Sequence, residues 1–228
     1  MKKFSLICAL SASALLICAA AALAAGVPVS PAPNATVDTP NPTFTWTVSA
    51  GASVSDILVS QTDHNDHGFL DRAIDDHQAH GKTSYAYTGS ILIPGTYYWQ
   101  LSGLDAAGQP AMSKIQRFVV PAIVKFSPVK ARWNPRFDNG RPVDYFVTTI
   151  RCNFDHKPTV ELKVFQGAKL LSTDSFVGHD CVDMHPYAFA DTFQKPVAMP
   201  KGTRLTMQFL VKYDRWTVES PLTPFRAH

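Results

Sequence analysis

The side chains best suited to metal chemistry are concentrated in one segment, residues 63–80, which holds four of the eight histidines of the chain. Imidazole and carboxylate groups are the usual protein ligands of zinc. Asp76 lies four residues before His80, and His77 lies three before it, so each would share a helix face with His80. The segment is therefore a candidate metal site, and its candidate ligands are His64, His67, Asp76, His77 and His80.

The same segment has a plainer interpretation. Its apolar residues recur at helical spacing and predict a short amphipathic helix on the edge of the fold, formed around Phe69, Leu70, Ala73, Ile74 and His77. Asp63, Asn65 and Gly68 resemble the start of a calcium loop, but Ile74 stands where that loop requires a glutamate. We favour a solvated helix and loop; the alternative is a metal-dependent binder or hydrolase.

The chain carries none of the motifs that mark a catalytic nucleophile or a catalytic zinc. It contains no G-x-S-x-G and no H-E-x-x-H sequence. Carboxylates flank many turns, but no pair is spaced in a way that marks a cleft. We therefore predict no enzymatic activity and no cofactor.

Residues 1–25 have the pattern of a secretory signal peptide. Lys2 and Lys3 form a positive start, an apolar stretch follows from Leu6 to Ile17, and Ala22-Leu23-Ala24 fits the small-x-small cleavage rule. We expect cleavage near Ala24 or Ala25 and a secreted or periplasmic protein. No second apolar span follows, so we expect no membrane span after cleavage.

The cysteines agree with export. Cys8 and Cys18 would leave with the signal peptide, which leaves Cys152 and Cys181. Two cysteines in an oxidising compartment most simply form one disulfide, and neither has a partner at C-x-x-C spacing for zinc. We predict a Cys152–Cys181 disulfide.

The elements that must position these residues are expected to be β-strands. The 17 prolines argue against long helices, and 46% hydrophobic residues are enough for packed cores. Alternation places Phe44 and Trp46 on one face of a strand, and Tyr97, Trp99 and Leu101 on one face of another. Both tryptophans are therefore expected to be buried.

Five short motifs resemble, in order, the bacterial fibronectin type III domain. P-T-F-T-W, I-L-V-S, P-G-T-Y-Y-W-Q-L, D-x-x-G and R-F-V-V are similar to its strands B, C and F, a hairpin turn, and strand G. The resemblance covers about residues 28–120 and implies a β-sandwich, but no particular ligand. It also implies that Tyr97 or Tyr98 ties its hydroxyl back to the preceding turn, and the alternation favours Tyr97.

The second half of the chain is again patterned as strands. Two strands with one apolar face each are predicted from Phe146 to Phe154 and from Leu205 to Tyr213, and Pro200-Lys201-Gly202-Thr203 echoes the turn at Pro94-Gly95-Thr96. We therefore predict an all-β protein of two tandem sandwiches. Residues 26–121 would form a fibronectin type III-like sandwich, and residues 122–228 an immunoglobulin-like sandwich with one disulfide.

Charge is distributed unevenly between these halves. Residues 27–121 carry 4 basic and 8 acidic side chains, a net of −4, whereas residues 122–228 carry 15 and 10, a net of +5. A basic run with aromatic residues begins near residue 125 and is a candidate patch for polyanions. The candidate binding residues are Arg132, Trp133, Arg136 and Trp216.

These observations favour a secreted, non-enzymatic binding or adhesion module that recognises a protein or glycan at the cell surface. Loops and edge strands are the parts of a sandwich that such modules use. The basic second half is expected to add affinity for polyanions.

Overall fold

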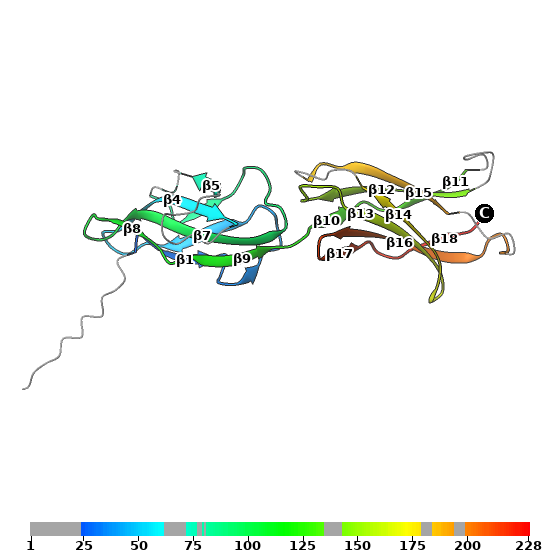
Figure 1. Ribbon diagram of the computed structural model, residues 1–228, viewed down its shortest axis with the longest axis horizontal. Coiled ribbons are helices and arrows are strands. Elements are labelled where there is room, and N and C mark those ends of the chain that lie inside the picture. The colour runs from blue at the N-terminus through cyan, green and yellow to red at the C-terminus, as the bar shows by residue number, and fades with distance from the viewer. Residues whose placement is uncertain are drawn as a thin grey trace, which may run out of the picture.

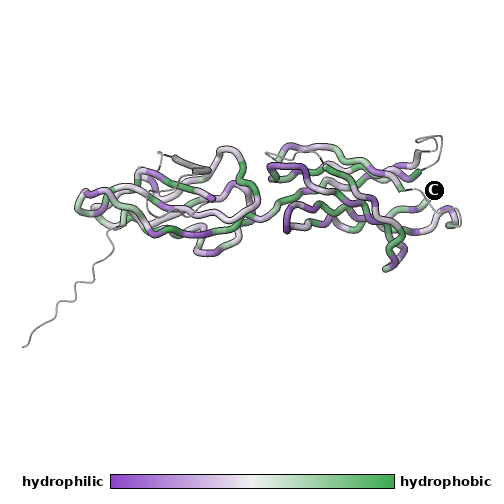
Figure 2. The backbone as a smooth tube through the Cα atoms, in the orientation of Figure 1, coloured by the Kyte–Doolittle hydropathy of each residue, from purple (hydrophilic) through white to green (hydrophobic). Residues whose placement is uncertain are grey.

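The computed structural model describes residues 24–61, 72–76, 79, 81–134, 143–178, 184–193 and 199–228. Its regular elements are β-strands, and they form two sandwiches that lie end to end (Figure 1). Polar and apolar residues alternate along the strands (Figure 2), which is the pattern of sheets buried on one face. None of the helices in the described ranges is long and apolar enough to cross a membrane.

The first sandwich packs a three-stranded sheet on a larger one. The smaller sheet has the order β1 (Val27–Ser30), β3 (Thr43–Thr47), β6 (Ser84–Ala86). The larger has the order β2 (Ala35–Thr36), β9 (Gln116–Val120), β7 (Gly95–Leu104), β4 (Ser53–Ser60), β5 (Arg72–Asp76), and β8 (Pro110–Met112) also pairs with β7. The strands predicted as C, F and G are therefore neighbours, and B lies in the facing sheet, as in immunoglobulin-like sandwiches.

Aromatic side chains fill the core of this sandwich, as the alternation predicts. Trp46 is 2% exposed and Trp99 is fully buried. The Phe44 ring meets Trp99 edge-on at 5.1 Å between centroids, and Tyr97 stacks on Phe118 at 5.6 Å. The Trp99 indole N–H donates to the Pro31 carbonyl at 3.3 Å, so this buried polar group is satisfied.

The tyrosine tie implied by the resemblance is present, and it uses Tyr97. The Tyr97 hydroxyl donates to the Ile93 carbonyl at 3.1 Å and accepts from Gln61 Nε2, also at 3.1 Å. Burial raises the pKa of Tyr97 to about 12 despite these hydrogen bonds. The hydroxyl is therefore held protonated, and it fixes the corner that leads into β7.

The second sandwich repeats this plan. In one sheet β12 (Val143–Cys152) lies between β15 (Tyr187–Phe193) and the two short strands β10 (Val124–Phe126) and β11 (Lys130–Asn134). The other has the order β14 (Lys169–Val177), β13 (Thr159–Gln166), β16 (Arg204–Tyr213), with β17 (Trp216–Glu219) and β18 (Thr223–Arg226) both pairing with β16. The predicted inward residues of β12 and β16 lie in one buried cluster, among them Phe146, Ile150, Met207 and Phe209.

The helix predicted from Phe69 to His77 is wrong where the structure describes the segment. Residues 72–76 form strand β5, which pairs antiparallel with β4, Val59 opposite Ile74. Pairing with the open edge of a sheet satisfies the backbone of this short segment better than one or two isolated helical turns, so tertiary context overrides the local spacing. Residues 62–71, 77–78 and 80 lie outside the described residues.

Candidate ligand-binding surface

Trp133 is the most prominent exposed aromatic side chain of the second sandwich. It lies on β11 opposite Asp144 of β12, and it is 45% exposed. The imidazole of His228 stacks on its indole at 5.9 Å between centroids, and the Lys201 ammonium lies 5.9 Å from the ring centroid. These neighbours hold the indole in place while leaving much of it open to solvent.

A buried carboxylate anchors this arrangement. Asp144 is 4% exposed; its Oδ1 lies 2.7 Å from His228 Nδ1, and its Oδ2 accepts from the His228 backbone N–H at 3.3 Å. A buried charge must be paired or hydrogen-bonded. Asp144 thus fixes His228, and His228 in turn supports the Trp133 ring.

Basic side chains surround Trp133 at this end of the sandwich. Arg226 Nη1 donates to the Gly202 carbonyl at 3.1 Å, next to Lys201, and Arg204 lies directly opposite Arg226 across β16 and β18. Arg132, beside Trp133 on β11, is also exposed. We call the surface made by Trp133, Lys201, Arg204, Arg226 and His228 the end surface; it is far from the first sandwich (Figure 1).

The predicted binding residues do not all meet here. Arg132 and Trp133 lie at or beside the end surface, and Arg136 is outside the described residues. Trp216 pairs with Tyr213 at the opposite end of the second sandwich, where it is half-buried with the Arg215 guanidinium 5.3 Å from its centroid. Trp133 and Trp216 therefore do not belong to one binding surface.

The predicted metal ligands are not brought together in the described residues. His64, His67, His77 and His80 lie outside them. Asp76 is on strand β5, opposite Ile57, so the helix-face argument that joined it to His80 does not apply. Within the described ranges no group of three or more His, Cys, Asp or Glu side chains is placed to hold a metal ion.

The predicted disulfide concerns one described cysteine. Cys152 is the last residue of β12, fully buried, with its Sγ 4.0 Å from the Tyr187 hydroxyl oxygen. Cys181 lies outside the described residues, so the Cys152–Cys181 bond stays a prediction.

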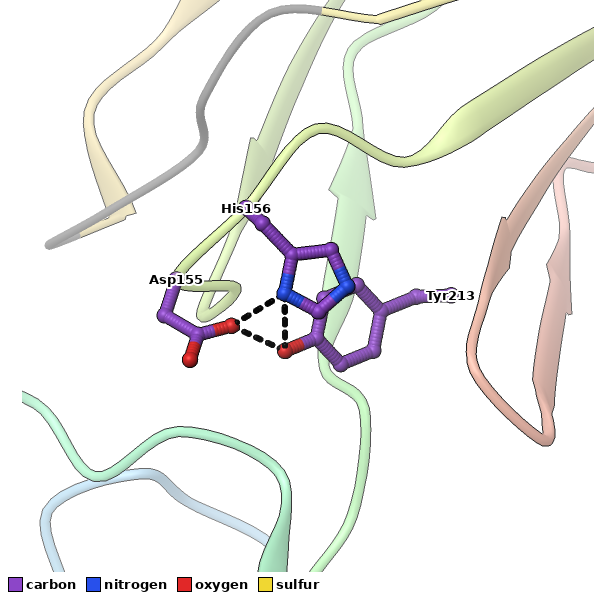
Figure 3. Close-up of polar contacts among 3 residues, drawn as sticks. All are labelled: Asp155, His156 and Tyr213. Atoms are coloured by element: carbon purple, nitrogen blue, oxygen red, sulfur yellow. Dashed lines mark hydrogen bonds and ion pairs between the residues drawn. The ribbon is translucent and has the colours of Figure 1, made fainter.

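Sequence reasoning missed a polar triad at the end of the second sandwich near the first (Figure 3). The Tyr213 hydroxyl donates to Asp155, and His156 Nδ1 lies 2.7 Å from Asp155 Oδ1 and 3.3 Å from the Tyr213 hydroxyl. The Tyr213 hydrogen bond, more than the neighbouring His156, lowers the pKa of Asp155. Burial, reinforced by Asp155, raises the pKa of Tyr213 above its ordinary value.

The triad is therefore an ionised carboxylate beside a protonated phenol. It ties the turn after β12 to the end of β16, and it contains no activated nucleophile. A signal for it was not available in the sequence, because Asp155 and Tyr213 are 58 residues apart. Lys201, Arg204, Arg226 and His228 were missed for the same reason: strand pairing, not local spacing, gathers them at the end surface.

Comparisons with known proteins give structural matches only. No family model matches the chain, and no curated protein matches it. Three of the solved structures similar to it are latent PorU from Porphyromonas gingivalis (12% identity, TM-score 0.35), a tetra-tandem repeat of the extending region of a large adhesion protein (14%, 0.38), and the fibronectin(III)-like modules of Clostridium thermocellum CbhA (13%, 0.27).

The matches cover 88%, 89% and 88% of this chain, and 19%, 48% and 91% of those chains respectively. The chain thus spans about a fifth and about half of the first two. At TM-scores below 0.5 these likenesses carry no argument about function, which must come from the residues of this chain.

Proposed function

We propose that this chain is an exported, non-enzymatic binding module that holds an acidic protein or glycan ligand of the cell surface at its end surface. The observation that carries the proposal is the Trp133 indole, 45% exposed yet braced by His228 and Lys201. An aromatic ring that is already fixed in place loses little conformational entropy when a ligand covers it. Tryptophan and arginine are also the side chains that most often dominate binding energy.

The charge of the end surface supports an acidic ligand. Lys201, Arg204 and Arg226 are exposed there. Asp144, which lies opposite Trp133 on β12, is buried and engaged by His228. Residues 122–228 as a whole also carry more basic than acidic side chains, so their net charge is positive too. A positive surface of this kind raises both the encounter rate and the selectivity for an anionic partner.

The sequence supports the remaining parts of the proposal. Residues 1–25 have the pattern of an export signal. Catalytic motifs are missing from the sequence, and the polar triad of the second sandwich holds its tyrosine protonated. The two sandwiches therefore act as a scaffold, and binding is assigned to the surface at one end of it.

The proposal is tested by comparing ligand capture by two exposed-residue variants. The purified protein is immobilised and exposed to cell-surface extract and to a panel of polysaccharides. Trp133→Ala should lower capture about tenfold or more, the usual loss for a central aromatic anchor. Met112→Ala is the matched control, because Met112 is similarly exposed, at 43%, but lies on the first sandwich. Equal capture by the two variants would contradict the proposal.

A further inference from the structure

Two arginines face one another at the end surface without an acidic partner. Arg204 of β16 and Arg226 of β18 are Cα partners in the antiparallel pair, and both are exposed. Within the part of the chain that the structure describes, neither guanidinium is ion-paired to a carboxylate. Like charges directly opposite each other destabilise a sheet. An anion placed between them would remove this repulsion.

The pair also borders a hollow in the surface. Arg204 and Thr206 of β16, Pro224 and Arg226 of β18, and Gly167 in the β13–β14 turn line a groove of about 550 Å³. One donor of Arg226 is used by the Gly202 carbonyl. A guanidinium has five N–H donors in a fork that matches a carboxylate or another oxyanion, so most of the donors of the pair are available to a ligand.

A series of contacts links the arginine groove to the Trp133 ring. Arg226 donates to the Gly202 carbonyl, Lys201 directly precedes Gly202, and the Lys201 ammonium lies over the Trp133 ring. A ligand that uses both must combine oxyanions with flat, weakly polar rings. An acidic polysaccharide has this combination, because its sugar rings carry carboxylate or sulfate groups and present C–H faces that pack on an indole.

A single-stranded nucleic acid also combines anions with flat rings, but it fits the end surface less well. Such strands are usually held by several aromatic side chains on which successive bases stack. Trp133 is the one tryptophan of the end surface, so successive bases would have a single indole to stack on.

We propose that the groove between Arg204 and Arg226 is an oxyanion subsite for an acidic polysaccharide, with Trp133 packing on an adjoining sugar ring. This inference rests on the proposed function and narrows its ligand to one chemical class. The oxyanion is a uronate carboxylate or a sulfate ester, which the two guanidinium groups would bind in the same way.

The test measures binding of the purified protein to polygalacturonate, dextran sulfate, neutral dextran and single-stranded DNA. We expect binding to one or both acidic polysaccharides and none to dextran. Arg204→Gln should weaken that binding about tenfold, as expected for the loss of a charged hydrogen-bonding partner. The same loss should be found for Arg226→Gln, and added salt should weaken binding by the wild-type protein.

The chain supplies a matched control. Lys125 of β10 and Arg151 of β12 form a second exposed basic pair across two strands, on the other sheet of the same sandwich. Arg151→Gln removes the same charge as Arg204→Gln, so it should leave binding unchanged. Among the residues that the structure describes, the Arg204 side chain makes no hydrogen bond or ion pair that Arg204→Gln would break. Thermal melting of each variant checks that folding is retained.

Each outcome is decisive. Polygalacturonate binding alone assigns the subsite to carboxylates, and dextran sulfate binding alone assigns it to sulfate esters. Three results would each overturn the inference. They are an equal loss of polysaccharide affinity in Arg204→Gln and Arg151→Gln, tighter binding to single-stranded DNA than to the acidic polysaccharides, and no binding to either acidic polysaccharide. If capture of another surface component still depends on Trp133, only the inference fails; if Trp133→Ala has no effect on any ligand, the proposed function fails as well.

Discussion

At the scale of single residues, the clearest electrostatic strain is at Asp191 of β15. Its Oδ1 accepts from the Thr192 backbone N–H at 2.7 Å, whereas its buried Oδ2 has no hydrogen-bond partner among the residues that the structure describes. Burial, with a smaller contribution from the charge of Asp174, raises the pKa of Asp191 to about 6. At neutral pH the protein therefore carries a partly buried carboxylate that the fold disfavours.

This carboxylate should make stability depend on pH. An aspartate in the unfolded chain titrates near pH 3.9, so between about pH 4 and pH 6 the folded protein retains a proton that the unfolded chain has lost. The stabilising contribution of protonated Asp191 is complete below this window and is lost as the pH rises through about 6. Because solvent partly screens the group, we expect a contribution of about 1 kcal/mol.

The measurement is urea unfolding at pH 4 and pH 7. Asp191→Asn should raise the free energy of unfolding at pH 7 and flatten its pH dependence over this window. Asp174→Asn removes only the neighbouring charge, so it should raise the free energy of unfolding at pH 7 by less than Asp191→Asn does. An Asp191→Asn protein that keeps the wild-type pH profile would show that Asp191 is not the group responsible.

At the scale of elements, the sequence predicted strands wherever one face is apolar. Phe44 and Trp46 alternate with threonines along β3, and Phe146 and Ile150 alternate with less buried residues along β12, because one face of each sheet is buried. The incorrect helix prediction at residues 72–76 has a different cause. That segment is held by pairing with β4, a contact between strands that leaves no periodic trace in the segment itself.

The end surface was predictable only in part, for a related reason. Arg132 and Trp133 are consecutive and conspicuous in the sequence. Arg204 and Arg226 become neighbours only through the register of β16 with β18. Sequence spacing cannot supply such a register, because it depends on which strands pair and on how each turn is closed.

Gly103 on β7 offers a test of strand packing in the first sandwich. A Cβ at this position would lie 2.1 Å from the Ser53 carbonyl oxygen, beside the register shift between Val54 and Asp56 of β4. Backbone atoms cannot move aside as a flexible side chain can, so β4 and β7 would have to separate. We expect Gly103→Ala to destabilise the fold by roughly 1–3 kcal/mol.

Thermal melting compares this variant with Leu104→Ala, which changes the next residue along the same strand. Leu104 is 42% exposed, so truncating it should have a small effect. Equal melting temperatures for the wild-type protein and Gly103→Ala would mean that the two strands are not as close at Gly103 as the register requires.

At the scale of the whole molecule, one amide side chain joins the two sandwiches. Asn153, fully buried directly after β12, donates from Nδ2 to the Leu92 carbonyl of the first sandwich at 3.1 Å and to the Pro121 carbonyl at 3.2 Å. Its Oδ1 accepts from the Ile123 backbone N–H at 2.8 Å. A single residue thus satisfies groups on the first sandwich and on the segment that connects it to the second.

The position of this junction bears on the proposed binding at the end surface. It lies at the opposite end of the second sandwich from the end surface (Figure 1). Fixing the two sandwiches end to end therefore holds the end surface away from the first sandwich. The extended arrangement also keeps the acidic charge of residues 27–121 away from the basic end surface. At such a separation physiological salt screens most of the attraction between the two charges.

The last prediction concerns the rigidity of this arrangement. Asn153→Ala leaves the Leu92 and Pro121 carbonyls and the Ile123 N–H without their partner, at a cost of about 1–3 kcal/mol for a buried unsatisfied group. Part of that cost can be relieved if the sandwiches swing apart and water reaches the exposed groups. Small-angle X-ray scattering should then show a broader distribution of molecular dimensions, while the strand content measured by circular dichroism is unchanged.

Asn41→Ala, which removes an exposed amide bonded to the Gly89 carbonyl within the first sandwich, should leave the scattering as it is. A scattering profile and a melting temperature unaffected by Asn153→Ala would show that the junction is held by other contacts.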